Sequence, residues 1–211
     1  MKRGMAMDDI TSIEELEAIY GAPDPLSIAK VATRLTPEYA AWIEASRFAV
    51  LSTVGPDGTD GSPRGDDGPV VRIHNETTLL MPDWRGNNRA DSLRNIVEDG
   101  RLSLMFMVPG KTNVIRVNGR GVLTRDSELM ARFRVKSREP RLVIKIAVAE
   151  IYSQCARALV RSALWDRDER EAALPTMGDI LKAQTQGGFD GATYDAEWPG
   201  RAAKTLWSMD A

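Results

Sequence analysis

The sequence predicts a mainly β protein in which an antiparallel sheet closes into a barrel and short helices flank it. Six or seven apolar stretches of strand length lie between residues 48 and 152, and hairpin-type turns join most of them. A doubly wound parallel sheet would need a helix after nearly every strand, and this region has few segments with a helical period. Together these observations favour an antiparallel barrel.

Two short helices are expected before the first strand. Ser12 and Glu15 form a capping-box pattern, which is typical of a helix start. Thr36 and Pro37 have the residue types of an N-cap and a first helical position. Residues 1–35 are therefore interpreted as an N-terminal helical arm that leads into the main domain.

The remaining elements follow from the alternation of apolar runs and turn residues. Strands are expected, in chain order, at residues 48–54, 59–64, 70–73, 77–81, 101–108, 113–123 and 141–152. A helix interrupts them after the fourth strand, and others are expected at 126–135, 153–164 and 176–186. We therefore expect a barrel domain over 36–165, followed by a C-terminal helical tail over 166–211 that packs on the barrel or on a dimer partner.

Composition and charge argue against several classes of protein. The formal net charge of −2 gives no support for general nucleic-acid binding. No apolar run is long enough to span a bilayer, and the first residues lack the apolar core of a signal peptide, so a cytoplasmic location without membrane association is expected. Cys155 is the single cysteine, which fits a reducing compartment, and it is expected to be a small buried side chain.

The single histidine weighs against metal and hydrolase chemistry. His74 lies in an expected hairpin turn, where an exposed side chain is the simplest interpretation. A zinc site built from Cys and His lacks its ligands, so no metal site is expected. No Gly-x-Gly-x-x-Gly pattern follows a strand, which argues against a dinucleotide-binding fold.

The stretch 78–99 carries the most informative local pattern. An apolar strand is followed by a Pro/Gly turn and then by apolar residues at helical spacing, so a helix is expected from about Asn88. Asn87, Asn88 and Arg89 would lie at its N-terminus, where unpaired backbone N–H groups and partial positive charge favour anions. The pattern indicates a phosphate site, with a solvated arginine beside an asparagine N-cap as the alternative.

Three blocks of sequence occur in an order that resembles a known family. They are SPRGD at 62–66, PDWRGNNRADSLRN at 82–95 and IRVNG at 115–119. Over roughly residues 40–152 the chain resembles the pyridoxamine 5′-phosphate oxidase-like family of flavin-binding split barrels, and most closely its broad, less characterised branch.

The resemblance implies a six-stranded antiparallel split β-barrel that forms a homodimer and binds flavin mononucleotide (FMN) at the subunit interface. The residues implied to lie near the flavin or its phosphate are Arg64 with its neighbours Gly65 and Asp66, then Asn87, Asn88, Arg89, Arg116 and Tyr152. Independently of the resemblance, Arg161 lies one helical turn after Arg157 and is expected to be a further anion contact, with a solvated basic face as the alternative.

Several of these residues also have a purely structural interpretation. Arg64 could form an ion pair with Asp66 or Asp67. Arg116 could lie on the solvent side of its strand, because a period of two gives the face but not the partner. Tyr152 could be a packed aromatic residue at an interface.

The sequence also departs from the true oxidases of the family. They carry an Arg-Lys pair where this chain has Asn88 and Arg89, and they end in Arg-Leu-x-Pro where this chain ends in LWSMDA. The helix after the sixth strand has Arg132 but lacks the Tyr with which they hold the substrate phosphate. These departures weaken the case for pyridoxamine phosphate as the substrate.

The resulting hypothesis is an FMN-dependent oxidoreductase that acts on an unidentified small molecule. The isoalloxazine ring would carry the chemistry, so no catalytic residue is named, although Tyr152 is a candidate proton donor. Two alternatives stay open. One is a non-catalytic flavin-binding or flavin-carrier protein, and the other is a reductase that uses a deazaflavin as a hydride donor.

Overall fold

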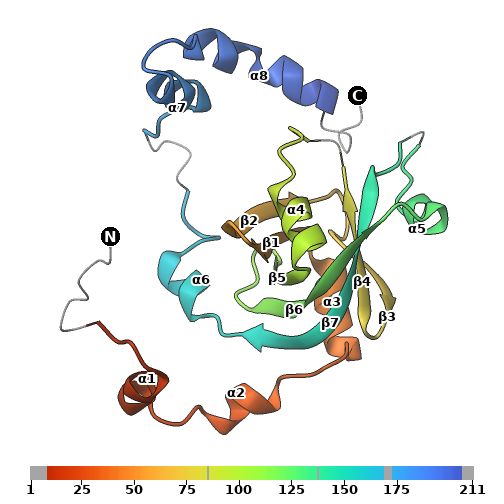
Figure 1. Ribbon diagram of the computed structural model, residues 1–211, viewed down its shortest axis with the longest axis vertical. Coiled ribbons are helices and arrows are strands. Elements are labelled where there is room, and N and C mark those ends of the chain that lie inside the picture. The colour runs from red at the N-terminus through yellow and green to blue at the C-terminus, as the bar shows by residue number, and fades with distance from the viewer. Residues whose placement is uncertain (1–8, 85, 137, 169–172, 206–211) are drawn as a thin grey trace.

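Seven antiparallel strands form one curved sheet, shown in Figure 1. The computed structural model describes residues 9–84, 86–136, 138–168 and 173–205, so the outer parts of the predicted arm and tail lie outside the described residues. The strands are β1 (Phe48–Gly55), β2 (Gly58–Gly65), β3 (Arg72–Asn75), β4 (Thr78–Asp83), β5 (Arg101–Met107), β6 (Val114–Thr124) and β7 (Leu142–Gln154). Their order in the sheet is β2-β1-β5-β6-β7-β4-β3.

The mainly β class with flanking helices is confirmed, whereas the six-stranded closed barrel is not. The sheet has seven strands, and among the described residues no ladder joins its edge strands β2 and β3. The sequence of β2 explains why it remains an edge. Pro63 cannot donate a backbone hydrogen bond, and Asp60 and Arg64 place charges on the inner face of the strand.

The hydrophobic core fills the concave side of the sheet. Alternate residues of the central strands share this face, and Leu51, Leu104 and Val117 form one fully buried row across β1, β5 and β6. Helix α3 (Pro37–Ala45) begins at the predicted Thr36 N-cap and buries Ile43 against this core. Helix α4 (Asp91–Glu98) packs on β1 and β6 and buries Ile96.

The other helices differ in how well the sequence predicted them. Helix α1 (Ile13–Tyr20) has the predicted capping box, and α5 (Ser127–Ala131), α6 (Arg157–Ser162) and α7 (Met177–Gln184) fall inside predicted ranges. Helices α2 (Pro25–Ala29) and α8 (Gly191–Thr205) were not predicted, because Pro and Gly at both places favour a chain break. Asp24 and Asp190 overcome that tendency by capping the first turns with their carboxylates.

Helices α7 and α8 form a hairpin whose backbones touch through two glycines. A Cβ on Gly178 would lie 2.2 Å from the carbonyl oxygen of Gly191, which is closer than real Cβ atoms approach. The carboxylate of Asp195 adds hydrogen bonds to the backbone N–H of Gly178 and to the hydroxyl of Thr176. The hairpin is therefore stabilised by close backbone contact and by the two hydrogen bonds that the Asp195 carboxylate accepts.

Replacing Gly178 with alanine is expected to open this hairpin without unfolding the sheet. The added methyl group forces the helices apart, and overpacking of this kind costs roughly 1–3 kcal/mol. Limited proteolysis should cut the variant faster between residues 173 and 205, while the thermal midpoint of the sheet stays unchanged. Gly200→Ala is the matched control, because a Cβ there meets nothing within 4 Å. Equal cleavage of both variants would contradict the prediction.

Among the residues that the structure describes, no helix is both long enough and apolar enough to cross a lipid bilayer.

Candidate functional site

An open cleft of about 800 Å³ lies between β2 and the segment that joins β4 to α4. One wall is the inner face of β2, and the other is the end of β4 with the start of α4. Residues at the beginning of β7 complete the lining. The lining includes Asp60, Ser62, Arg64, Asp83, Trp84, Asn87, Asn88, Arg89, Ala90, Asp91, Ser92 and Arg141.

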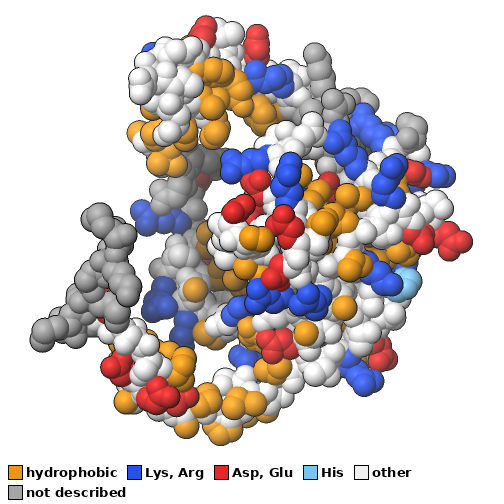
Figure 2. All heavy atoms as spheres, viewed as in Figure 1, with side chains coloured by type: hydrophobic (Ala, Val, Ile, Leu, Met, Phe, Trp, Pro, Cys, Tyr) orange, Lys and Arg blue, Asp and Glu red, His pale blue; other side chains and the backbone are white. Residues whose placement is uncertain are grey.

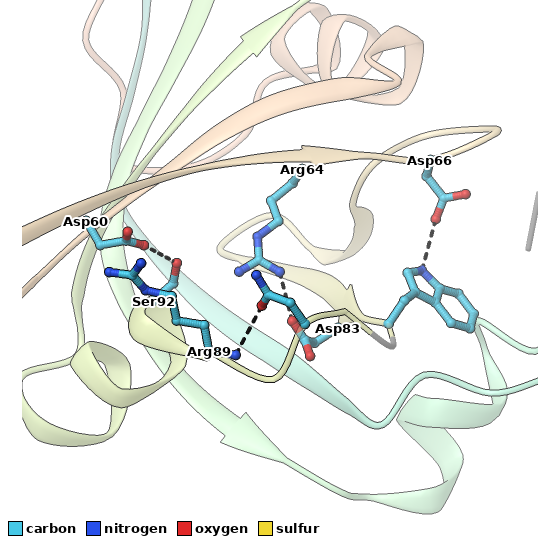
Figure 3. Close-up of polar contacts among 8 residues, drawn as sticks. Asp60, Arg64, Asp66, Asp83, Arg89 and Ser92 are labelled. Carbon is cyan, nitrogen blue, oxygen red and sulfur yellow. Dashed lines mark hydrogen bonds and ion pairs between the residues drawn. The ribbon is translucent and has the colours of Figure 1, made fainter. Parts of the chain in front are cut away.

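Arg64 is the least exposed of the described arginines that line the cleft. Its Nη1 donates to Asp83 Oδ1 at 2.8 Å, and only 21% of its side chain and 13% of that of Asp83 are exposed. Figure 3 shows the two side chains pointing toward one another across the cleft. The Arg64 Nε is buried and has no hydrogen-bond partner among the described residues. A buried N–H of this kind normally has an acceptor, so Arg64 retains an unused donor.

Arg64 pairs with Asp83 and not with Asp66 or Asp67, the partners considered from the sequence. Asp67 instead accepts a hydrogen bond from Arg47 at 3.2 Å, and Asp66 accepts one from Trp84. Asp83 ends β4 and faces the inner side of β2, which brings its carboxylate to Arg64. Gly65 is the last residue of β2, so it lies next to the cleft without lining it.

The helix after β4 starts three residues later than predicted. It begins at Asp91, because Asn88 and Ala90 adopt left-handed backbone conformations with φ of 64° and 60°. Such values are uncommon for residues other than glycine, and the strain they carry is often found at functional sites. Asn87, Asn88 and Arg89 therefore lie in the loop that precedes the helix rather than in its first turn.

The start of α4 still offers donors to the cleft. Ala90 is its N-cap residue and makes no side-chain capping bond, so the first-turn N–H groups have no side-chain acceptor at this cap. Asn87 Oδ1 accepts the backbone N–H of Arg89 at 3.1 Å, which fixes the shape of the loop. Ser92 is buried and its hydroxyl donates to Asp60 Oδ2 at 2.5 Å, which ties α4 to β2.

The charges of the cleft are balanced between arginines and carboxylates. Arg89 is 79% exposed and pairs with Asp91. Arg141 Nη1 donates to Asn88 Oδ1 at 2.7 Å and carries no ion pair in this contact. Among the described residues three arginines line the cleft, and they come from β2, from the loop before α4 and from the residue before β7.

Asp66 and Trp84 form the outer end of the same region. The indole Nε1 of Trp84 donates to Asp66 Oδ2 at 3.3 Å, and the indole packs on the small apolar cluster of Leu80, Phe133 and Val143. Burial raises the pKa of the Asp66 carboxyl above its ordinary value of 3.8, and the hydrogen bonds from Asp67 and Trp84 only partly oppose this. The carboxylate form of Asp66 is therefore destabilised by the folded structure.

The raised pKa of Asp66 predicts a pH-dependent loss of stability. A folded-state pKa above the unfolded value means that the folded chain binds the proton of Asp66 more tightly than the unfolded chain does. The contribution of Asp66 to the free energy of unfolding is therefore greatest below pH 3.8 and is lost as pH rises through the raised pKa. The free energy of unfolding of the native chain, relative to Asp66→Asn, should fall as pH rises from below 3.8 through the raised pKa. Urea unfolding of both chains across this range measures it, and a constant difference would contradict the prediction.

Arg116 and Tyr152 lie outside the cleft lining, on the convex face of the sheet. They are paired across β6 and β7, and the Arg116 guanidinium lies 5.1 Å from the centre of the Tyr152 ring. In the next pair on this face, Asn118 Nδ2 donates to Glu150 Oε1 at 2.6 Å. Within one chain, these two predicted flavin contacts are therefore grouped with each other and not with Arg64 and Arg89.

The predicted anion contact on α6 is also separate from the cleft. Arg161 is exposed, and its Nε donates to the backbone carbonyl of Arg157 at 3.3 Å. Cys155, just before this helix, is exposed, so the expectation of a buried side chain was wrong. The Cys155 thiol accepts a hydrogen bond from the backbone N–H of Arg157, and this lowers the pKa of the thiol.

Sequence reasoning missed four residues that shape the cleft: Asp60, Asp83, Ser92 and Arg141. The period of two along β2 could have found Asp60, because it shares the inner face with Arg64. Asp83 and Ser92 lie inside the block 82–95 that carries part of the family resemblance, but they were assigned no role. Nothing in the sequence near Arg141 indicates that the start of β7 reaches Asn88.

The residues that line the cleft all lie within a segment that matches a protein family. Residues 35–155, more than half of the chain, match the sequence model of the pyridoxamine 5′-phosphate oxidase family. The chain belongs to this family. No curated protein matches the sequence.

Solved structures with a similar arrangement are distant in sequence. HupZ from Group A Streptococcus is 17% identical and aligns over 57% of this chain and 94% of its own, with a TM-score of 0.48. General stress protein 26 from Bacillus anthracis is 22% identical over 54% and 88% of the two chains, with a TM-score of 0.42. An FMN-binding protein from Syntrophomonas wolfei is 14% identical over 67% and 95%, with a TM-score of 0.44.

Proposed function

We propose that this family member binds FMN in the cleft between β2 and the β4–α4 loop, with the phosphate between Arg64 and the start of α4. The observation that carries the proposal is the buried Nε of Arg64, a charged donor for which the described part of the chain offers no acceptor. Arg89 and Arg141 line the same opening, and the first turn of α4 adds uncapped N–H groups. A phosphate dianion suits this set of donors.

The carboxylates of the cleft are compatible with this assignment. Asp83 is bound by Arg64 and Asp60 by Ser92, so both are already compensated within the protein. Asp91 competes directly for Arg89, but their pair is exposed, and exposed pairs contribute only about 0–1 kcal/mol. A dianionic phosphate can therefore displace Asp91 from Arg89 at small cost. Arg64, Arg89, Asn87 and Asn88 are the residues proposed to hold the cofactor phosphate.

A homodimer would bring the second group of predicted contacts to the cofactor. On the convex face of the sheet, Val50, Met105, Arg116 and Tyr152 form one row across four strands and remain partly exposed in the single chain. A second copy packed on this face would bury the row and place Arg116 and Tyr152 beside the partner's cleft. We propose this face as the dimer interface and the cleft rim as the place where FMN meets both subunits.

The proposed activity is oxidation or reduction of an unidentified small molecule. When bound, the isoalloxazine ring supplies the redox chemistry, and the chain supplies anchoring and orientation. Arg64 fixes the phosphate end because its own geometry is fixed by Asp83. Asp66 and Trp84 stabilise the outer end of the cleft, beyond the phosphate donors.

Titration of the purified protein with FMN, riboflavin and a deazaflavin nucleotide tests the proposal. Riboflavin lacks the phosphate, so it is the matched control for the phosphate donors. We expect FMN to bind and riboflavin to bind at least about tenfold more weakly, because a charge-assisted phosphate contact contributes roughly 1.5–3 kcal/mol. Equal affinity for FMN and riboflavin would overturn the phosphate assignment. Binding of the deazaflavin alone would indicate a deazaflavin-dependent reductase, and FMN binding without reduction by NADH or NADPH would favour a carrier.

A further inference from the structure

Helix α1 presents an apolar face that stays uncovered by the residues that the structure describes. None of its eight residues is buried, and Ile13, Leu16, Ile19 and Tyr20 are all exposed, Tyr20 by 79%. These four side chains lie on one side of the helix by their spacing. An eight-residue helix is marginal in water on its own, so its stability requires a surface on which this face packs.

The charges of α1 indicate what that surface must carry. Glu14, Glu15 and Glu17 make the helix strongly acidic, and it has no basic residue in its last turn. Glu17 flanks the apolar face, one residue after Leu16. The complementary surface is therefore apolar in the centre and basic at its edge.

Helix α6 and the turn after it have this character. Val160 and Leu164 are exposed, and Arg157 and Arg161 stand one helical turn apart beside them. None of the residues of α6 is buried. Its position on the barrel is fixed, because the indole Nε1 of Trp165 donates to the carbonyl of Lys111 at 2.8 Å. Both helices lie outside the residues 35–155 that match the family.

The linker keeps α1 away from the α6 of its own chain. Ala32 forms two backbone hydrogen bonds with Ile151, of 2.9 and 2.8 Å, and the hydroxyl of Tyr39 donates to the carbonyl of Lys30 at 2.6 Å. Beyond these anchors α2 begins at Pro25 with Asp24 as its cap, which stiffens the connection. Figure 1 shows α1 and α6 on the same side of the barrel but apart from each other.

On this side of the molecule the space-filling view (Figure 2) shows a hollow beside the N-terminal arm. Figure 2 shows apolar side chains of the N-terminal arm and of the α7–α8 hairpin bordering it from two sides. A second copy of the chain is the partner that is always present at equal concentration. In a two-fold dimer each contact occurs twice, so one pair of complementary surfaces gives two interfaces.

We infer that α1 of each subunit docks on α6 of the other, so that the two N-terminal arms are exchanged in the homodimer. The inference rests on the dimer proposed above but does not depend on the flavin. Glu17 of one subunit, at the edge of the apolar face, then lies next to the basic side chains of the partner's α6, and the apolar faces meet beside it. Glu14 lies on the far side of α1 and adds to the negative charge of the helix. The arm thereby adds an interface that the family segment alone lacks.

Charge reversal tests the exchange, because it distinguishes contacts between chains from contacts within a chain. One chain carries Glu14→Lys and Glu17→Lys, and the other carries Arg157→Glu and Arg161→Glu. When both are co-expressed with tags of different mass, a mixed dimer restores attraction at both contacts. Native mass spectrometry should then show mixed dimers in about tenfold or greater excess over the statistical ratio, since like charges in contact disfavour each pure dimer.

The control reverses the same number of charges elsewhere. A chain with Glu38→Lys and Glu44→Lys on α3, co-expressed with the Arg157→Glu and Arg161→Glu chain, should give only the statistical ratio of dimers. A statistical ratio for the α1 and α6 pair, or monomers throughout, would overturn the inference. Rescue only when both reversals stand in one chain would assign the contact to a single subunit and would also overturn it. Flavin titration of the same samples reports separately on the proposed cofactor site.

Discussion

Replacing Arg64 with alanine is expected to lower both the affinity for FMN and the free energy of unfolding. The buried Nε of Arg64 lacks an acceptor among the residues that the structure describes, and removing the side chain takes away a charge-assisted contact of roughly 1.5–3 kcal/mol to the phosphate. It also leaves the carboxylate of Asp83, which is 13% exposed, without its partner. Breaking a well-buried pair costs about 3–5 kcal/mol, and the partial exposure here reduces the expected loss to roughly 2–3 kcal/mol.

A second substitution separates the two effects. Asp83→Asn in the Arg64→Ala background removes the unpaired buried charge, so part of the lost stability should return while FMN affinity stays low. Urea unfolding measures the first quantity and fluorescence titration with FMN the second. If FMN affinity recovered together with stability, Arg64 would act only through folding and would have no contact with the phosphate. Undiminished FMN affinity in Arg64→Ala would remove the central donor of the proposed site.

The sequence predicted the strands well because their apolar residues alternate over turns rich in Gly, Pro and Asp. All seven stretches appear as strands, and the Thr36 N-cap and the Ser12 capping box lie where expected. The pairing of strands that are distant in the sequence was harder to predict. The edge position of β2 depends on Pro63 and on charged inner-face residues, whose effect becomes clear only when the order of the sheet is known.

The candidate site could be predicted in part for a similar reason. Arg64 was named because the resemblance implies an arginine at the end of the second strand, and Asn87 to Arg89 because an expected helix start follows the fourth strand. The structure brings them to one cleft. The start of α4 was misplaced, since the left-handed conformation of Ala90 has no signal in its residue type. Asp83 and Arg141 escaped notice because their partners, Arg64 and Asn88, are distant in sequence.

Replacing Arg89 with alanine should weaken FMN binding without a measurable change in stability. Its side chain is 79% exposed, so the folded chain loses almost no buried contact, and its pair with Asp91 contributes little. The phosphate loses a guanidinium partner, which lowers affinity by about 1.5–3 kcal/mol, or roughly ten- to 150-fold. Riboflavin affinity should stay the same, because riboflavin has no phosphate.

Asp91→Asn should raise the affinity for FMN, in contrast to Arg89→Ala, which should lower it. The carboxylate of Asp91 occupies Arg89 and repels a phosphate at the start of α4, where a negative charge already interacts with the helix dipole. Asparagine removes both effects while keeping nearly the same shape, so FMN should bind a few-fold more tightly, with riboflavin again unaffected. If Asp91 and the phosphate compete for the Arg89 guanidinium, FMN titrations should show a lower affinity in Arg89→Ala and a higher affinity in Asp91→Asn. Equal and parallel changes would show that Arg89 and Asp91 act on the fold of the loop and not on the cofactor.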